Sequence, residues 1–200
     1  MNPQDFFSEF IERVKGGLQS GWITEPEFYD RSFMASRNHH SRMVRIISES
    51  IRTLGEESAL EFKITSKTAP GRYSLGRGFR ADAVSFPSPR SEFDAVYEYR
   101  SIDANPKKTA GKIAPMSSVR GCDFWALIFP ITASGTGNGT AKVFDAVNRA
   151  IMRLPTPTFA SARLLVLTIE RNAARELRYR LRTYRSPRDA VNRIKGEFLG

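Results

Sequence analysis

Two long apolar runs constrain the fold of this chain more than any other feature of its sequence. Residues 124–131 and 164–169 are apolar at almost every position, so both faces of an extended strand would be apolar. Such strands lie inside a sheet that is covered on both sides, and we predict them at residues 123–131 and 163–170. A predicted helix at residues 141–154 separates them. This alternation of strands and helices is typical of an α/β fold.

Three further strands precede this region, and short links join them. Leu60, Phe62 and Ile64 alternate with polar residues, which is the two-residue period of a half-buried strand. A glycine-rich bend leads to a strand at residues 79–86, and a proline-containing turn leads to a strand at residues 94–101. Links this short favour antiparallel neighbours. The expected fold class is therefore α/β, with a mixed central sheet flanked by helices.

Helical spacing and charge divide the chain into three parts. An apolar stripe that includes Ile47 and Ile51 predicts a helix at residues 38–54, where the core is expected to begin. The arginine-rich residues 172–184 and 187–199 are predicted to form two basic helices. The expected organisation is an accessory helical segment at 1–37, an α/β core at 38–170, and basic C-terminal helices packed on the core at 171–200.

The charge balance favours a polyanionic partner. The chain has 31 lysine and arginine residues against 21 aspartate and glutamate residues, which gives a net charge of +10. Phosphates attract dispersed cations of this kind through the release of counterions. Four arginines recur at the spacing of one helix face: Arg171, Arg175, Arg178 and Arg182. We expect this stripe to bind the backbone of nucleic acid, and the alternative is a solvated helix face without a partner.

Cysteine content and the length of the apolar runs exclude two classes of protein. A single cysteine, Cys122, cannot form an internal disulfide, so a disulfide-stapled secreted scaffold is excluded. The apolar runs fall far short of the ~20 residues that span a bilayer. The first ten residues lack the basic stretch of a signal peptide. We therefore expect a soluble protein of the cytoplasm that has no membrane partner.

The candidate catalytic residues lie in the second and third predicted strands. Asp82 is in the middle of one strand, and Glu98 and Arg100 face the same side of the next. If these strands pair as a hairpin, two carboxylates approach one another beside a cation. Proteins bind Mg²⁺ through one or two carboxylates together with water and substrate phosphate. Asp82 and Glu98 are therefore predicted to bind Mg²⁺ or Mn²⁺, which would polarise a phosphodiester and activate water.

These residues resemble the motif of the PD-(D/E)xK phosphodiesterase superfamily, which includes many restriction endonucleases and DNA repair nucleases. The similarity covers residues 38–131, in the order helix, strand, strand with Asp82, strand with Glu98 and Arg100, helix, strand. It implies a restriction endonuclease-like core in which Asp82 and Glu98 bind metal. Arg100 stands in the position of the family's lysine and Ala81 in that of its proline. An arginine cannot act as a base, but it can hold a phosphate or stabilise developing charge.

Other polar groups have simpler structural explanations. The carboxylates of the predicted metal site also suit a cross-strand ion pair at a solvated face. Glu61 and Lys63 share one face of the first strand, and we expect a surface ion pair there because no acid-bearing strand precedes them. His39 and His40 lack the further histidine and cysteine ligands of a zinc site. Helical phase puts His40 near the core face, so we expect a packed or capping histidine at that position.

Together these features predict a metal-dependent DNA nuclease that hydrolyses phosphodiester bonds, an endonuclease of restriction or repair type. The alternative is a non-catalytic nucleic-acid-binding domain of the same fold. A third possibility is a protein whose basic helices meet an acidic protein partner. The expected partner is nucleic acid, and DNA by the resemblance. A homodimer is compatible with the resemblance, because many nucleases of the superfamily dimerise to cut both strands.

Overall fold

Seven strands form one mixed sheet in the computed structural model, and their order across the sheet follows their order in the chain. They are β1 (Glu57–Ile64), β2 (Phe79–Phe86), β3 (Ala95–Tyr99), β4 (Phe124–Pro130), β5 (Arg163–Arg171), β6 (Leu177–Tyr184) and β7 (Glu197–Leu199). Strands β3, β4 and β5 are parallel, and the other neighbouring pairs are antiparallel. The structure describes residues 1–30, 37–65, 67–68, 78–88, 92–99, 113–117, 119–131, 139–154, 163–171, 176–191 and 197–199.

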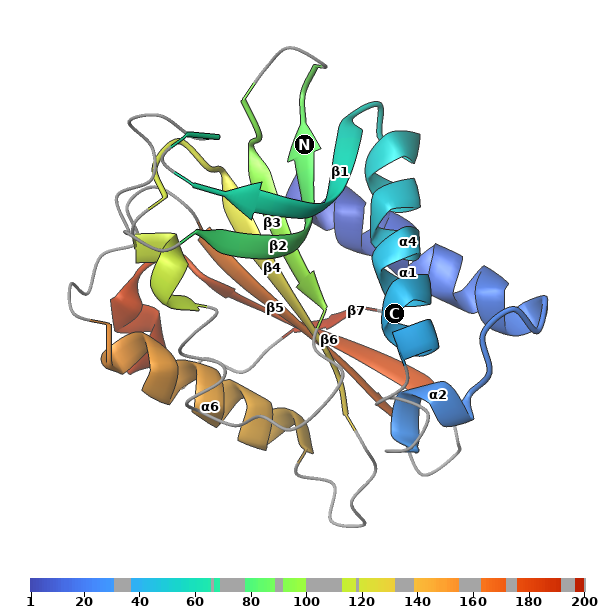
Figure 1. Cartoon of the computed structure of the whole chain (residues 1–200). Helices are drawn as coiled ribbons and strands as arrows, with labels where there is room; N and C mark the ends of the chain where they lie inside the picture. Colours follow the sequence, from blue (N-terminus) through green and yellow to red (C-terminus); the bar gives the residue numbers. More distant parts are fainter. Residues whose placement is uncertain are drawn as a thin grey trace.

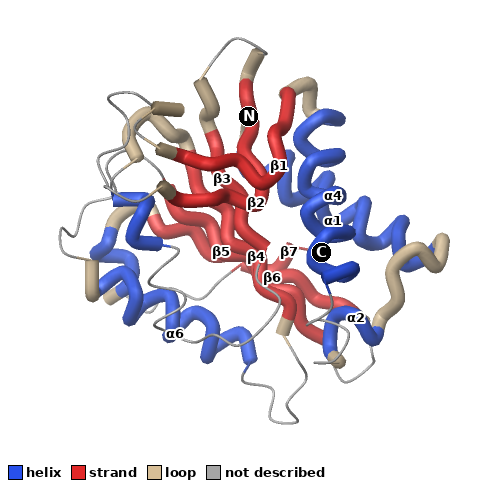
Figure 2. Tube along the Cα trace, in the orientation of Figure 1, coloured by secondary structure: helices blue, strands red, loops and turns tan. Residues whose placement is uncertain are grey.

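Helices cover both faces of the sheet (Figure 1, Figure 2). One face carries α1 (Pro3–Gln19), α2 (Pro26–Tyr29) and α4 (Arg37–Thr53). The other carries α6 (Gly139–Met152) and the short 3-10 helices η1 (Ala114–Ser117) and η2 (Pro187–Ala190). The predicted α/β class, with a mixed sheet flanked by helices, is confirmed. None of the helices in the described residues has the length and apolar character needed to cross a membrane.

The two helical layers produce two hydrophobic cores, one on each side of the sheet. Ile47 of α4 packs in the core that contains Ile128 of β4, and Val147 of α6 packs in the core that contains Leu127. Successive residues of β4 therefore point into different cores, and all seven of its residues are buried. Full burial of one such aliphatic side chain stabilises the fold by about 1.5–3 kcal/mol. The continuous apolar run that predicted this strand reflects its contact with both cores.

The N-terminal helix is part of one of these cores. Asn2 caps it by accepting a hydrogen bond from the Gln4 N–H, and Pro3 occupies its first turn. Phe6 and Phe10, one helical turn apart, are both fully buried. The Phe6 ring centroid lies 4.5 Å from that of Tyr97 on β3. The segment predicted to be accessory therefore packs directly on the central sheet.

The C-terminal region differs from its prediction. Residues 177–184 form strand β6, which pairs with β5, and residues 187–190 form a short 3-10 helix. The prediction of two long basic helices is therefore wrong over the described part of this region. Tyr179 and Leu181 are buried in the core on the α4 side of the sheet, the α4-side core, and arginines alternate with them along the strand. This two-residue apolar period is the signal of a strand, whereas the helical prediction rests on the spacing of the arginines.

Candidate metal centre

Asp82 lies at a local interruption of the sheet. Strands β1 and β2 pair along their length, but the register skips the position at which Glu61 and Asp82 would face each other. The φ angle of Glu61 is 50°, in the left-handed region that costs a residue with a side chain roughly 1–2 kcal/mol. On the other side of β2, the pairing with β3 ends at Ala83 and Tyr97. The predicted antiparallel pairing of β2 with β3 is confirmed, and Asp82 sits just beyond its end.

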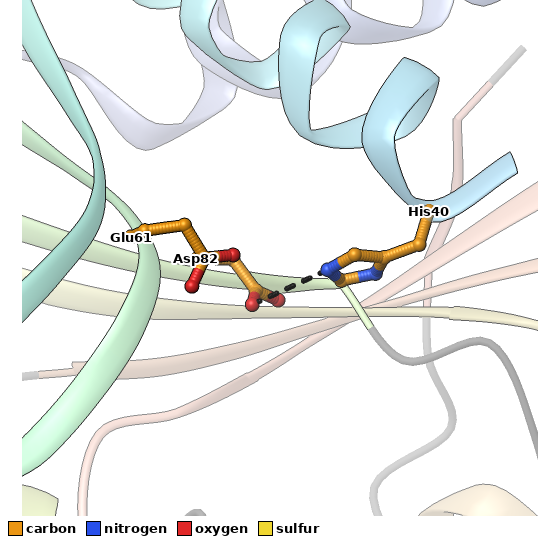
Figure 3. A group of neighbouring side chains, drawn as sticks. All are labelled: His40, Glu61 and Asp82. Carbon is orange, nitrogen blue, oxygen red and sulfur yellow. Dashed lines mark ion pairs between the residues drawn. The ribbon is translucent and has the colours of Figure 1, made fainter. Parts of the chain in front are cut away.

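Three elements bring one imidazole and two carboxylates together at this interruption (Figure 3). His40 comes from α4, Glu61 from β1 and Asp82 from β2. One possible ligand atom of each side chain lies within 4.8 Å of those of the other two, and His40 Nε2 is 3.5 Å from Asp82 Oδ1. An octahedral ion with bonds of ~2.1 Å holds its ligand atoms about 3–4.2 Å apart. The three groups are therefore close enough to hold a divalent cation after adjustment of their side chains.

The backbone fixes the orientation of the Asp82 carboxylate. Its Oδ2 accepts a hydrogen bond of 2.8 Å from the Tyr99 N–H of β3. Its Oδ1 is left on the side of His40. The Asp82 side chain is largely buried, with 13% exposed, whereas the Glu61 side chain is 55% exposed. A metal at this position would thus have one ligand held by the sheet and another at the surface, where water and substrate can reach it.

The charge of Asp82 also controls the protonation of His40. The hydrogen bond with Asp82 raises the pKa of His40 above its ordinary value of 6.5. Burial opposes this increase, and the charges of Asp82, Glu61 and Glu98 add to it. Without a metal, the imidazole is therefore protonated over a wider pH range than a free histidine and balances part of the negative charge of the cluster.

This pKa shift predicts a pH-dependent contribution of His40 to stability. A raised pKa in the folded state stabilises the fold below pH 6.5, and the stabilisation is lost as the pH rises through the folded-state pKa. In EDTA, we expect His40→Gln to lower the free energy of unfolding by up to about 1 kcal/mol near pH 6, and by less near pH 9. Urea unfolding at both pH values measures the difference. An equal effect of the substitution at both values would contradict the ion pair.

The neighbouring histidine belongs to a buried hydrogen-bond network. His39 is completely buried; its Nδ1 lies 3.1 Å from Glu27 Oε2 and its Nε2 lies 2.7 Å from the Tyr99 hydroxyl. Burial raises the pKa of Tyr99 well above 10 and lowers the pKa of His39. The tyrosine O–H therefore donates to Nε2, and the Nδ1–H donates to Glu27. Glu27 also accepts a hydrogen bond of 2.8 Å from Arg42. The network ends at Tyr99, whose backbone N–H holds Asp82.

The other two residues of the predicted catalytic set are Glu98 and Arg100. Glu98 is buried on β3, and its charge is near enough to affect the pKa of His40. Its carboxylate is not in the group of three mutually close ligands that the described residues contain. Arg100 lies outside the described residues. The structure brings Asp82 together with His40 and Glu61, and a shared metal at Asp82 and Glu98 stays a prediction.

One interpretation of the sequence needs correction, and another was incomplete. His39, and not His40, faces the core, which is an error of one residue in the helical phase. Glu61 was set aside because no acid-bearing strand precedes it, yet Asp82 lies on the antiparallel strand that follows it. The surface ion pair expected at Glu61 is present, with Arg80 as its partner at 3.6 Å. The glycine-rich bend between the two strands indicates a hairpin, and a hairpin would bring Glu61 and Asp82 opposite each other.

The predicted arginine stripe is not formed by its described members. Arg171 ends β5 and lies 3.5 Å from Glu25, whereas Arg178 is exposed on β6. Arg182 is buried, donates a hydrogen bond to the Asp189 carbonyl and lies over the Tyr184 ring. Its guanidinium supports the fold and is not available to a phosphate backbone. Arg175 lies outside the described residues.

Comparison of this chain with family models, with curated proteins and with solved structures finds no match.

Proposed function

We propose that this protein is a metal-dependent nuclease that hydrolyses phosphodiester bonds, with DNA as its substrate. The observation that carries the proposal is the meeting of His40, Glu61 and Asp82 within 4.8 Å. Two carboxylates supply the negative charge that a divalent cation needs. The net charge of +10 supports a nucleic acid as the substrate. The resemblance to the PD-(D/E)xK superfamily supports the same reaction.

Each residue has a distinct role in the proposed reaction. Asp82 is the central ligand. The Tyr99 N–H donates a hydrogen bond to its Oδ2, which fixes the orientation of the carboxylate. His40 and Glu61 complete the side-chain ligands. A divalent ion held by these residues would polarise the phosphodiester and activate a water molecule. Arg100 is proposed to contact the phosphate that is cleaved, as the resemblance implies.

The ligand types also bear on the identity of the metal. Mg²⁺ prefers oxygen ligands, whereas an imidazole nitrogen suits first-row transition metals. A set of two carboxylates and His40 therefore favours Mn²⁺ over Mg²⁺. We expect both ions to support the reaction, and Mn²⁺ to do so at lower concentration.

Incubation of the purified protein with supercoiled plasmid DNA and with single-stranded RNA tests the function. Each substrate is offered in EDTA, in Mg²⁺ and in Mn²⁺. We expect DNA cleavage only with a divalent ion, because the proposed reaction depends on the ion to polarise the phosphodiester and to activate water. Retention of DNA without cleavage in any metal, with affinity that falls steeply with salt, would favour the non-catalytic nucleic-acid-binding domain instead.

A further inference from the structure

Two cations lie next to the candidate metal centre on the β1–β2 hairpin. Lys63 of β1 pairs in register with Arg80 of β2. The Glu61–Asp82 position is two residues further along both strands, so the two pairs are successive on one side of the hairpin. Both Lys63 and Arg80 are exposed, and the Arg80 side chain is 67% accessible. An acidic cluster is thus followed directly by a basic one.

The orientation of this basic pair follows from the residues between its members. Phe62 and Ile64 pack in the α6-side core, and so does Ala81 of β2. Because side chains alternate along a strand, Lys63 and Arg80 point to the opposite side of the sheet. The ion pair of 3.6 Å between Arg80 and Glu61 agrees with this placement. The cations therefore share a side with the metal ligands.

A glycine leaves room for the lysine beside β2. A Cβ atom at Gly78 would lie 3.1 Å from Lys63 Cε, which is tighter than ordinary van der Waals contact. The Lys63 stem therefore lies against the backbone just before β2 begins.

These cations contribute little to the fold, because exposed ion pairs are weak and solvent screens them. They also oppose the binding of a positive metal ion at the neighbouring carboxylates. A bound phosphate offsets this repulsion, because its negative charge is attracted both by the metal ion and by the two cations. An ammonium supplies a point charge and a guanidinium supplies two parallel donors, which suit the oxygens of a phosphodiester.

We propose that Lys63 and Arg80 bind a backbone phosphate of the nucleic acid next to the metal held by Asp82. This inference rests on the proposed nuclease function and assigns the substrate contact to the β1–β2 hairpin. The phosphate would lie over the exposed face of the hairpin, and Arg80 would exchange part of its contact with Glu61 for the phosphate oxygens when Glu61 binds the metal.

The test compares the double variant Lys63→Gln, Arg80→Gln with the matched control Lys142→Gln, Arg149→Gln. The control removes two exposed cations from α6, on the other face of the sheet. Binding of a fluorescent DNA duplex is measured in Ca²⁺ over a range of KCl concentrations. Each lost phosphate contact lowers the slope of log affinity against log salt by roughly 0.9. Because the two cations share one phosphate, we expect the hairpin variant to lose about one unit of slope, and the control to keep the wild-type slope.

A wild-type slope in the hairpin variant, with its melting temperature unchanged, would overturn the phosphate contact. Cleavage assays on the same proteins separate this result from a failure of the proposed function. Cleavage by wild type together with an unchanged slope removes only the hairpin contact. A reduced slope in the hairpin variant supports the phosphate contact. If the wild-type protein also cleaves no DNA in Mg²⁺ or Mn²⁺, the proposed nuclease function is overturned while the contact stands. Absence of DNA binding by the wild-type protein would overturn both.

Discussion

Replacement of His39 by leucine is expected to lower the free energy of unfolding by about 3 kcal/mol. Leucine fills most of the space but removes both polar partners of a buried network. The Tyr99 hydroxyl loses its acceptor at 2.7 Å, and Glu27 loses the donor at 3.1 Å. Glu27 is itself buried, so water cannot replace the lost hydrogen bond to its carboxylate without a cost in free energy. Urea unfolding monitored by circular dichroism measures the loss.

Two further variants show whether the network causes this effect. Tyr99→Phe removes one hydroxyl and is expected to cost about 1 kcal/mol. Arg45→Gln changes an exposed residue of the same helix, 68% accessible, and is expected to stay within about 0.5 kcal/mol of wild type. A loss for His39→Leu no larger than that for Arg45→Gln would contradict the network.

Replacement of Asp82 by asparagine is expected to reduce metal-dependent cleavage by more than about 100-fold. Loss of groups that only orient a metal ligand already costs 10–100-fold in affinity or activity, and Asp82 is a proposed ligand itself. The amide oxygen of asparagine can still accept the Tyr99 N–H, so the fold is expected to remain intact. Initial rates of plasmid cleavage in Mn²⁺ measure the effect.

The matched control for this variant is Asp145→Asn on α6, which removes one exposed carboxylate from the other face of the sheet. Its cleavage rate is expected to equal that of wild type. Equal rates for Asp82→Asn and Asp145→Asn would contradict a role of Asp82 in the reaction. Glu98→Gln, measured in parallel, shows whether the buried carboxylate of β3 joins the metal as the resemblance implies.

The fold was predictable where burial leaves a strong pattern in the sequence. Strand β4 is buried on both faces, and this burial is recorded in its sequence as a continuous apolar run. Strand β6 was missed because Arg178 and Arg182 are four residues apart, which also suits a helix. Arg182 is nevertheless buried, because its guanidinium donates a hydrogen bond to a backbone carbonyl and lies over two aromatic rings. Tertiary contacts of this type leave no periodic signal.

The candidate site was only partly predictable for a related reason. Asp82 stood out because a carboxylate in the middle of an apolar strand needs a partner. Its partners, His40 and Glu61, come from a helix and from the preceding strand, and their meeting depends on where α4 begins relative to the hairpin. A pattern along the chain records the spacing within one element. It does not record the distance between elements.

Titration of Mn²⁺ into the metal-free protein by calorimetry tests the central claim most directly. We predict that the wild-type protein binds a single ion per chain at the centre formed by His40, Glu61 and Asp82, and that Asp82→Asn gives no binding heat while remaining folded. Folded wild-type protein that binds no Mn²⁺, or an Asp82→Asn variant that binds it as tightly as wild type, would contradict the metal centre.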